Sequence, residues 1–289
     1  MVAQSSVKRN AVKDVAAAWK AWLSAFGYLR KQRLQAYHWV GPSAILLITW
    51  VGWVFSEAIR QAAKVQLSKG LSHLGIDAAS LEQSDGWAGS IALWAVSQLE
   101  WILELGIILL IFWLKLKITK YLLLTLVAPF MSLLAAAIRF RETGQSSPLT
   151  ASGLIRDVFR GLRTALSLFL FELALTIALA ISGLLLLLLA PPVVAILSPV
   201  LVALSWAVGS YFYGAAVFDA VFEQQGINWR NSLREGWSRK GHLLGIGMVF
   251  SLLMAIPLIG PIVAALIGPI PCTAAAAKLT FSSAPTRTP

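Results

Sequence analysis

Charged residues are scarce in this chain of 289 residues: they make up 13% of it, about half the share typical of a soluble domain. Hydrophobic residues make up 58%, and the mean hydropathy is +0.74. So little charge is not enough to cover the surface of a water-soluble domain of this size. The composition therefore excludes an ordinary soluble domain and predicts an integral membrane protein, whose main partner is the lipid bilayer.

Residues with catalytic or ligating chemistry are also few. Cys272 is the single cysteine, which excludes an intrachain disulfide. The three histidines, His38, His73 and His242, are too widely spaced for a metal site or paired haem ligation. The chain has no Walker loop, dinucleotide-binding fingerprint, G-x-S-x-G or HExxH motif. We expect no enzymatic activity, no cofactor and no bound metal.

Acidic residues are outnumbered by basic ones, and the formal net charge is +11. The basic residues flank the apolar runs, as the positive-inside rule expects, and no nucleic-acid-binding motif accompanies them. The excess of positive charge therefore indicates how the chain is oriented in the membrane, and we expect no nucleic-acid partner.

Residues 1–42 form a basic region ahead of the first apolar run. Between residues 12 and 26, apolar side chains recur every three or four residues and so share one face of a helix. Lysines occupy the other faces, which is typical of an amphipathic helix lying in the headgroup layer. The alternative is a helix packed on a partner protein. The apolar positions are Val12, Val15, Ala16, Trp19, Trp22, Leu23 and Phe26.

A membrane-embedded domain is expected over 43–281, followed by a polar tail, 282–289. About four transmembrane helices are predicted, because a bilayer core requires roughly 20 apolar residues and four runs can supply them. The first run reaches this length only by continuing past Ser56. The runs are about 43–56, 91–114, 164–190 and 193–218.

Two further apolar segments, 121–138 and 243–281, are predicted to enter the membrane and return without crossing it. Lys and Arg outnumber acids eight to two between residues 115 and 163, which favours one side of the membrane for that whole region. A crossing by 121–138 would move the arginines after it to the opposite side. The same reasoning makes 243–281 a re-entrant hairpin and puts both termini in the cytoplasm, with the bacterial inner membrane as the expected location.

The turn of this hairpin is predicted at Pro257, Gly260 and Pro261. Proline lacks an N–H group and glycine permits a tight reversal, so an apolar helix is interrupted here. Non-helical backbone at membrane depth is tolerated where protein or a water-filled cavity surrounds it, and such broken helices often line transport sites. The alternatives are a hairpin wedged into the helix bundle, or two short kinked spans.

Three carboxylates, Glu100, Glu104 and Glu172, fall inside predicted spans. A charge within a membrane is costly, so these residues should face a partner or a wet cavity. One interpretation is a polar path for an ion or a proton. The other is pairing with Lys or Arg between helices. Asp219 and Glu223, at the end of the fourth span, are expected to cap the helix or pair locally.

Three basic residues, Arg30, Lys31 and Arg33, stand just before the first span. They are candidates for an anion-binding group, and the alternative is that they are ordinary positive-inside anchors. Further along the chain, Gly241 and Gly245 are four residues apart in an apolar run, a spacing that indicates close helix packing.

Two segments resemble a known family. "YLLLTLVAPFMSLLA" (121–135) resembles the L-x-x-P-F-x-x-x-L-A segment of the CysZ-type sulfate permeases, which share a family with the eukaryotic etoposide-induced endoplasmic reticulum membrane protein. Residues 218–279 are similar to the family's C-terminal half, with an acidic residue ending a span, an Arg-rich helix, a G-x-G start and a close rich in small residues. The resemblance covers most of residues 20–280.

The resemblance implies a helical protein with long spanning helices and hemi-penetrating helix pairs. It also implies that sulfate binds at a motif of roughly G-L-R-R-F before the first span. Here the corresponding segment is "FGYLRKQRLQAYHWVGP" (26–42), in which Gly27, Arg30 and Arg33 are present but not contiguous.

The expected function is thus a permease or channel for a small anion, with sulfate implied by the family. The alternative is a non-transporting subunit or scaffold of a larger membrane complex, to which the Trp-rich N-terminal helix would dock. A homo-oligomer is compatible with either function.

Overall fold

The structure is a computed structural model that describes residues 10–50, 61, 65, 105, 117–145, 151–256 and 259–282. Every regular element in these residues is a helix, which confirms the predicted all-α class. The chain forms two compact units, Leu47–Lys120 and the remainder, and the description below concerns the remainder. Its labelled helices are α1 (Ala11–Lys31), the 3-10 helix η1 (Gln35–Trp39), α5 (Ala151–Leu189), α6 (Pro191–Glu223), α7 (Trp229–Ser238), α8 (Lys240–Met254), α9 (Gly260–Ile267) and α10 (Pro269–Phe281).

Three described helices are long and apolar enough to cross a membrane: Lys117–Thr143, Phe159–Leu186 within α5, and Ala195–Glu223 within α6. Each has at least 27 residues and is therefore about 40 Å long, more than the hydrocarbon core of about 30 Å. If α9 and α10, which meet at a bend of 41°, formed one broken span, there would be a fourth. The chain is a multi-pass helical membrane protein.

The two spans within α5 and α6 agree with the predicted spans at 164–190 and 193–218. The predicted span at 43–56 is helical as far as residue 50, where the described segment ends. The predicted span at 91–114 lies outside the described residues except for residue 105.

The segment predicted to re-enter at 121–138 lies instead in one unbroken helix, Lys117–Thr143. Pro129 stands in its interior and removes one backbone hydrogen bond. Val127 and Met131, on either side of the proline, are buried, and this packing offsets the loss. A continuous helix runs in one direction, so the segment does not turn back within its own length, and this part of the prediction is wrong.

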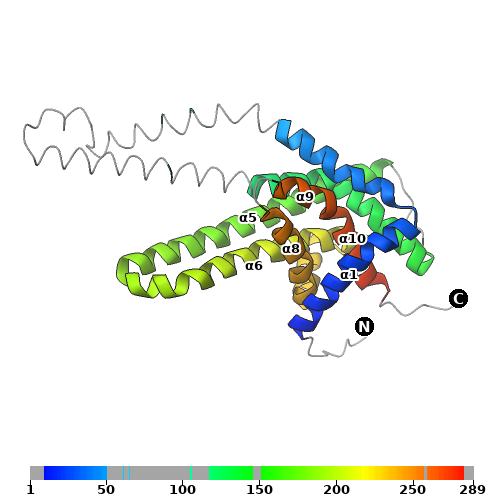
Figure 1. Ribbon diagram of the computed structural model, residues 1–289. Coiled ribbons are helices and arrows are strands. Elements are labelled where there is room, and N and C mark those ends of the chain that lie inside the picture. The colour runs from blue at the N-terminus through cyan, green and yellow to red at the C-terminus, as the bar shows by residue number, and fades with distance from the viewer. Residues whose placement is uncertain are drawn as a thin grey trace, which may run out of the picture. The chain divides into compact units, whose positions relative to one another are not determined.

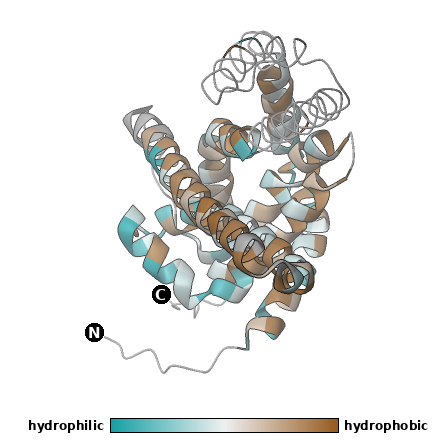
Figure 2. Cartoon of the chain, turned by 90° about the vertical axis from the view of Figure 1, so that its left-hand side faces the viewer, coloured by the Kyte–Doolittle hydropathy of each residue, from teal (hydrophilic) through white to brown (hydrophobic). Residues whose placement is uncertain are grey.

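α5 and α6 form a long hairpin that extends away from the other labelled helices (Figure 1). The two helices meet at Ala190, and Pro191 opens α6. Proline suits a first helical position, because the N–H that it lacks would have no partner there. Apolar residues follow most of the hairpin's length (Figure 2), and many, such as Leu184 and Ile196, are exposed. So much exposed apolar surface is what a membrane-embedded hairpin presents to lipid.

The chain is interrupted between α8 and α9, at the turn that the sequence predicts, although Pro257 itself lies outside the described residues. A Cβ placed on Gly260 would lie 2.4 Å from the carbonyl oxygen of Met254. Further along, the Sγ of Cys272 lies 4.0 Å from the carbonyl oxygen of Ile246. Gly260 therefore adjoins the end of α8, whereas Cys272, later in the chain, adjoins an earlier part of α8. The chain reverses direction between α8 and α9, and α9–α10 run antiparallel to α8.

α8 packs through its glycines on two sides. Gly241 and Gly245 contact α1, and a Cβ on Gly245 would lie 2.7 Å from the Cβ of Ala18. Gly247 faces α6, where a Cβ would lie 1.6 Å from the carbonyl oxygen of Ser210. Backbones approach this closely only where a side chain is missing. The close packing predicted from the spacing of Gly241 and Gly245 is confirmed.

α1 packs on α8 and α10 through a face of mostly small residues, on which Ala18, Ala25 and Leu29 are fully buried. The apolar stripe predicted from the sequence takes part in this packing only in part. The backbone of Val15 adjoins Gly245 of α8, and Trp22 is half-buried against α9, whereas Val12 is 77% exposed and Leu23 is 66% exposed. Periodicity located the larger apolar side chains, whereas most of the fully buried positions of the contact are small residues that it did not single out. The exposed stripe is left available to lipid.

Replacing Gly247 with alanine is expected to destabilise the protein. The added Cβ would overlap the carbonyl oxygen of Ser210, and forcing α6 and α8 apart should cost about 1–3 kcal/mol. Gly27→Ala in α1 is the matched control, because a Cβ there meets nothing within 4 Å and alanine favours a helix by about 1 kcal/mol. Thermal unfolding in detergent should place Gly247→Ala below the wild type and Gly27→Ala at or above it. Equal melting temperatures of the two variants would contradict this packing.

Candidate functional site

α1 ends in a turn in which the C-cap, Gln32, is followed by an arginine in the left-handed backbone conformation. Arg33 has a φ of 56°, a value at which a residue other than glycine is strained. Its N–H donates to the carbonyl of Arg30, and that of Leu34 donates to the carbonyl of Leu29, the pattern of a glycine-terminated helix. Glycine would remove the strain, so an arginine at this position indicates a use for its side chain.

Arg30, Lys31 and Arg33, the predicted anion-binding group, lie on this turn, and all three are exposed. None of them makes an ion pair with another residue in the described part of the chain. Arg30 and Lys31 also stand in the last turn of α1, where cations offset the negative end of the helix dipole. Neighbouring like charges repel, so an anion held among them would be stabilised.

The helix Lys117–Thr143 holds the turn in place with two side chains near its end. Arg141 donates from Nη1 to the backbone carbonyl of Gln32 at 2.5 Å and to its side-chain oxygen at 2.9 Å. The hydroxyl of Tyr28 donates to Glu142 at 2.9 Å. Burial, together with this bond to a carboxylate, raises the pKa of Tyr28 to about 12.

A further cation comes from α10, whose Lys278 has its Nζ 4.9 Å from the centre of the Tyr28 ring. His38, in η1, adds no charge at pH 7, because burial lowers its pKa. Sequence reasoning missed Arg141, which is 109 residues from Gln32. We call the assembled group the α1-end basic cluster: Arg30, Lys31, Arg33, Arg141 and Lys278.

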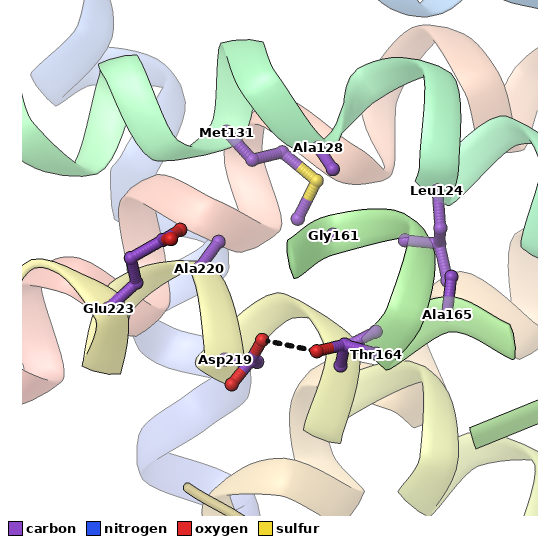
Figure 3. A pocket seen from close by; sticks show the side chains of 10 residues that line it. Leu124, Ala128, Met131, Gly161, Thr164, Ala165, Asp219, Ala220 and Glu223 are labelled. Atoms are coloured by element: carbon purple, nitrogen blue, oxygen red, sulfur yellow. Dashed lines mark hydrogen bonds between the residues drawn. The ribbon is translucent and has the colours of Figure 1, made fainter. Parts of the chain in front are cut away.

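A second polar site lies between the helix Lys117–Thr143, α5 and α6 (Figure 3). Asp219 accepts hydrogen bonds from Arg160 at 3.1 Å and from Thr164 at 2.9 Å. Arg160 also lies 3.5 Å from a carboxylate oxygen of Glu223 and donates to the carbonyl of Ile227 at 2.8 Å. The sequence predicts that Asp219 and Glu223 cap the helix or pair locally; instead both pair with Arg160 of α5, and this pairing joins the base of the α5–α6 hairpin.

Beside these carboxylates is a cavity of about 20 Å³, enough for about one water molecule. Carboxylates on its edge disfavour an anion, so this site is better suited to structure than to anion binding. Its remaining lining is mostly small and apolar: Leu124, Ala128, Met131, Gly161, Ala165, Ala216 and Ala220.

Glu172, one of the three carboxylates predicted to form a polar path, is fully buried. It accepts a 2.5 Å hydrogen bond from the hydroxyl of Tyr121 on the neighbouring helix, and Thr176 donates to its backbone carbonyl. The contact is an interhelical pairing between a carboxylate and a phenol. Glu100 and Glu104 lie outside the described residues, so the polar path stays a prediction.

The two described residues of the predicted hinge, Gly260 and Pro261, begin α9. The indole N–H of Trp22 in α1 donates to the carbonyl of Ile267, at the other end of α9, at 3.3 Å. The helix that carries the basic cluster is thereby joined to the hairpin that follows the turn.

Most of these elements lie in a region that matches a known protein family. Residues 21–264 match the family described as sulfate transporter CysZ/etoposide-induced protein 2.4. The chain belongs to this family. A comparison with curated proteins finds no match.

Membership of the CysZ/etoposide-induced protein family confirms the resemblance carried by 121–135, and that carried by 218–279 as far as residue 264. The matched region begins within α1 and ends within α9, so it contains the α1-end turn, the α5–α6 hairpin and the glycines of α8. Within the segment that resembles the family's sulfate motif, Gly27 and Arg30 lie near the end of α1 and Arg33 directly follows its C-cap, Gln32.

Raising the pH from 10 to 12 is expected to loosen the α1-end turn. Below pH 10, Tyr28 is protonated whether the protein is folded or unfolded, and its bond to Glu142 stabilises the fold. Above pH 10 the unfolded state ionises first, so this stabilisation is lost as the pH approaches about 12. Tyr28→Phe should cost about 1 kcal/mol at pH 8 and lose less stability than the wild type between pH 10 and 12.

Unfolding in detergent at pH 8, 10 and 12 measures both effects. Tyr37→Phe is the control, because the Tyr37 hydroxyl makes no hydrogen bond within the described residues. If the wild type and Tyr28→Phe lost stability in parallel from pH 10 to 12, Tyr28 would not be the responsible group.

Proposed function

We propose that this protein is a permease or channel that carries a small anion across the membrane, with sulfate as the first substrate to test. The observation that carries the proposal is the α1-end basic cluster. Its cations Arg30, Lys31 and Arg33 are exposed and make no ion pair within the described residues, and η1 alone separates them from the helix that begins at residue 40. Membership of a family that includes sulfate transporters supports the same function.

In this proposal the residues of the cluster have different roles. Arg30 and Arg33 bind the anion, because a planar guanidinium can donate two parallel hydrogen bonds to a sulfate oxygen pair. Lys31 raises the local positive potential. Arg141 acts as a positioning residue, since it grips Gln32 at two oxygens and so fixes the turn that carries Arg33.

The proposed passage involves the hairpin formed by α8, α9 and α10. α8 has 15 residues and is therefore about 22 Å long, shorter than a hydrocarbon core of about 30 Å. We place the turn before Gly260 within the membrane, which makes the hairpin re-entrant and provides unpaired backbone groups at membrane depth. As part of the proposal, we place the basic region 1–42 on the cytoplasmic side of a bacterial inner membrane, because positively charged residues favour that side. The C-terminus lies on the same side if the chain makes an even number of complete crossings.

The proposed transport requires no enzymatic step and no cofactor. What supports this part of the proposal is the sequence, which has no nucleotide-binding, hydrolase or metalloprotease motif. Anion selection by cations and backbone groups needs neither a metal nor a covalent intermediate.

A second function, that of a non-transporting subunit or scaffold, is favoured by the exposed stripe on α1. Val12, Trp19 and Leu23 present an apolar surface that a partner protein could cover as well as lipid could. Native gel migration after mild solubilisation distinguishes the two functions. Copurification with stoichiometric other proteins favours the scaffold, whereas a monomer or homo-oligomer argues against it.

The proposed transport predicts radiolabelled sulfate uptake into proteoliposomes above that of empty vesicles. Arg33→Ala should reduce uptake about tenfold, the loss expected when one charge-assisted hydrogen-bond donor is removed. Lys20→Ala is the matched control, because it removes an exposed cation from the same helix outside the cluster. Arg141→Gln should raise the sulfate concentration needed for half-maximal uptake. Absence of uptake, or equal uptake by Arg33→Ala and the wild type, would refute the proposal.

A further inference from the structure

One side of α7 carries arginines and an exposed tryptophan. Arg230, Arg234 and Trp237 are spaced by four and three residues, so they share one side of the helix, and all three are exposed. Trp237 is 66% exposed. The opposite side packs inward through Ser232 and Gly236, which are buried. The charged side is therefore a surface of the folded chain.

Two more exposed cations adjoin this side. The guanidinium carbon of Arg163, from α5, lies 4.5 Å from the centre of the Trp229 ring, and the Nζ of Lys240, from α8, lies 5.5 Å from that of Trp237. We call this surface the α7 basic face: Arg163, Arg230, Arg234, Trp237 and Lys240.

The positive charge of the α7 basic face is not neutralised by nearby acids. None of its four cations makes an ion pair among the residues that the structure describes. Glu235, on the same helix, is bonded to Arg239 at 3.0 Å, and Asp219 is bonded to Arg160. Four positive charges therefore remain for an external anion.

The position of α7 in the chain keeps this face close to the membrane surface. Five residues, 224–228, separate α7 from the apolar span Ala195–Glu223, and five residues reach at most about 18 Å. The rings of Trp237 and Tyr211 lie in a T-shaped arrangement at a centroid distance of 6.1 Å. Tyr211 stands 20 residues, or about 30 Å, after Pro191, which opens α6, and this is the thickness of a hydrocarbon core. Tyr211 and Trp237 therefore lie at one membrane surface when the α5–α6 turn lies at the other. Tryptophan and tyrosine concentrate at the level of the lipid headgroups.

From this arrangement we propose that the α7 basic face binds the phosphate headgroups of anionic phospholipids. Guanidinium groups bind phosphate oxygens in pairs, and an indole at the same level rests among the upper acyl chains. The charge is complementary to the lipid, and the short connection to α6 holds the face within reach of it. This binding is independent of anion transport, so either can fail without the other.

Quenching of Trp237 fluorescence by brominated lipid tests the proposal on the full-length protein. The protein is reconstituted in bilayers that contain phosphatidylglycerol or phosphatidylcholine brominated near the headgroup end of the acyl chain. The signal of the wild type minus that of Trp237→Phe isolates this tryptophan. We expect stronger quenching by the phosphatidylglycerol, and a preference that falls about fivefold for each charge removed in Arg230→Gln and in Arg230→Gln/Arg234→Gln.

Lys13→Gln/Lys20→Gln is the matched control, because it removes two exposed cations from α1 and should leave the preference unchanged. If the double α7 variant does not reconstitute, Arg234→Gln alone replaces it. Equal quenching by the two lipids would overturn the proposal. Absence of quenching by both lipids would overturn it and would indicate that a protein covers the face. Loss of the lipid preference in inorganic phosphate, but not in chloride of equal ionic strength, would overturn it and would indicate a site for free phosphate.

Discussion

The backbones of α6 and α8 come together where Gly247 lies against the carbonyl of Ser210, and the arrangement of the other short helices depends on this contact. Gly214 of α6 repeats the approach, since a Cβ there would lie 1.9 Å from the carbonyl oxygen of Leu243. Within a membrane, helices gain little from hydrophobic burial against each other, so association relies on close packing. Glycines on both helices, Gly214 and Gly247, allow the two backbones to pack this closely.

This contact positions both surfaces to which we assign binding. One side of α8 packs on α6, and Gly241 and Gly245 on its other side pack on α1. The end of α1 carries the α1-end basic cluster. The Cβ of a residue at position 236 would lie 3.0 Å from the Leu243 side chain, so α7 is seated on the start of α8 with its charged side outward. The antiparallel return through α9 and α10 then brings Lys278 to Tyr28. The two surfaces to which we assign binding thus depend on the same packed core.

The features that could be predicted from the sequence are those that depend on local composition. Apolar length predicted the spans in α5 and α6, and proline and glycine predicted the interruption before Gly260. It failed at Pro129, where tertiary packing tolerates a residue that breaks isolated helices. It could not pair Arg160 with Asp219, or Arg141 with Gln32, because 59 and 109 residues separate them and no local pattern records such contacts. These contacts between residues far apart in the sequence form only in the folded chain.

Disulfide trapping of the α6–α8 contact tests this account most directly. The hydroxyl oxygens of Ser210 and Ser251 lie 2.9 Å apart, so Ser210→Cys/Ser251→Cys in a Cys272→Ala background should crosslink under mild oxidation. Ser210→Cys/Leu252→Cys is the control, since Leu252 lies on an exposed side of α8. Peptide mapping by mass spectrometry should find the disulfide in the first pair and little in the second. Equal crosslinking of both pairs, or crosslinking of the second alone, would contradict the proposed packing.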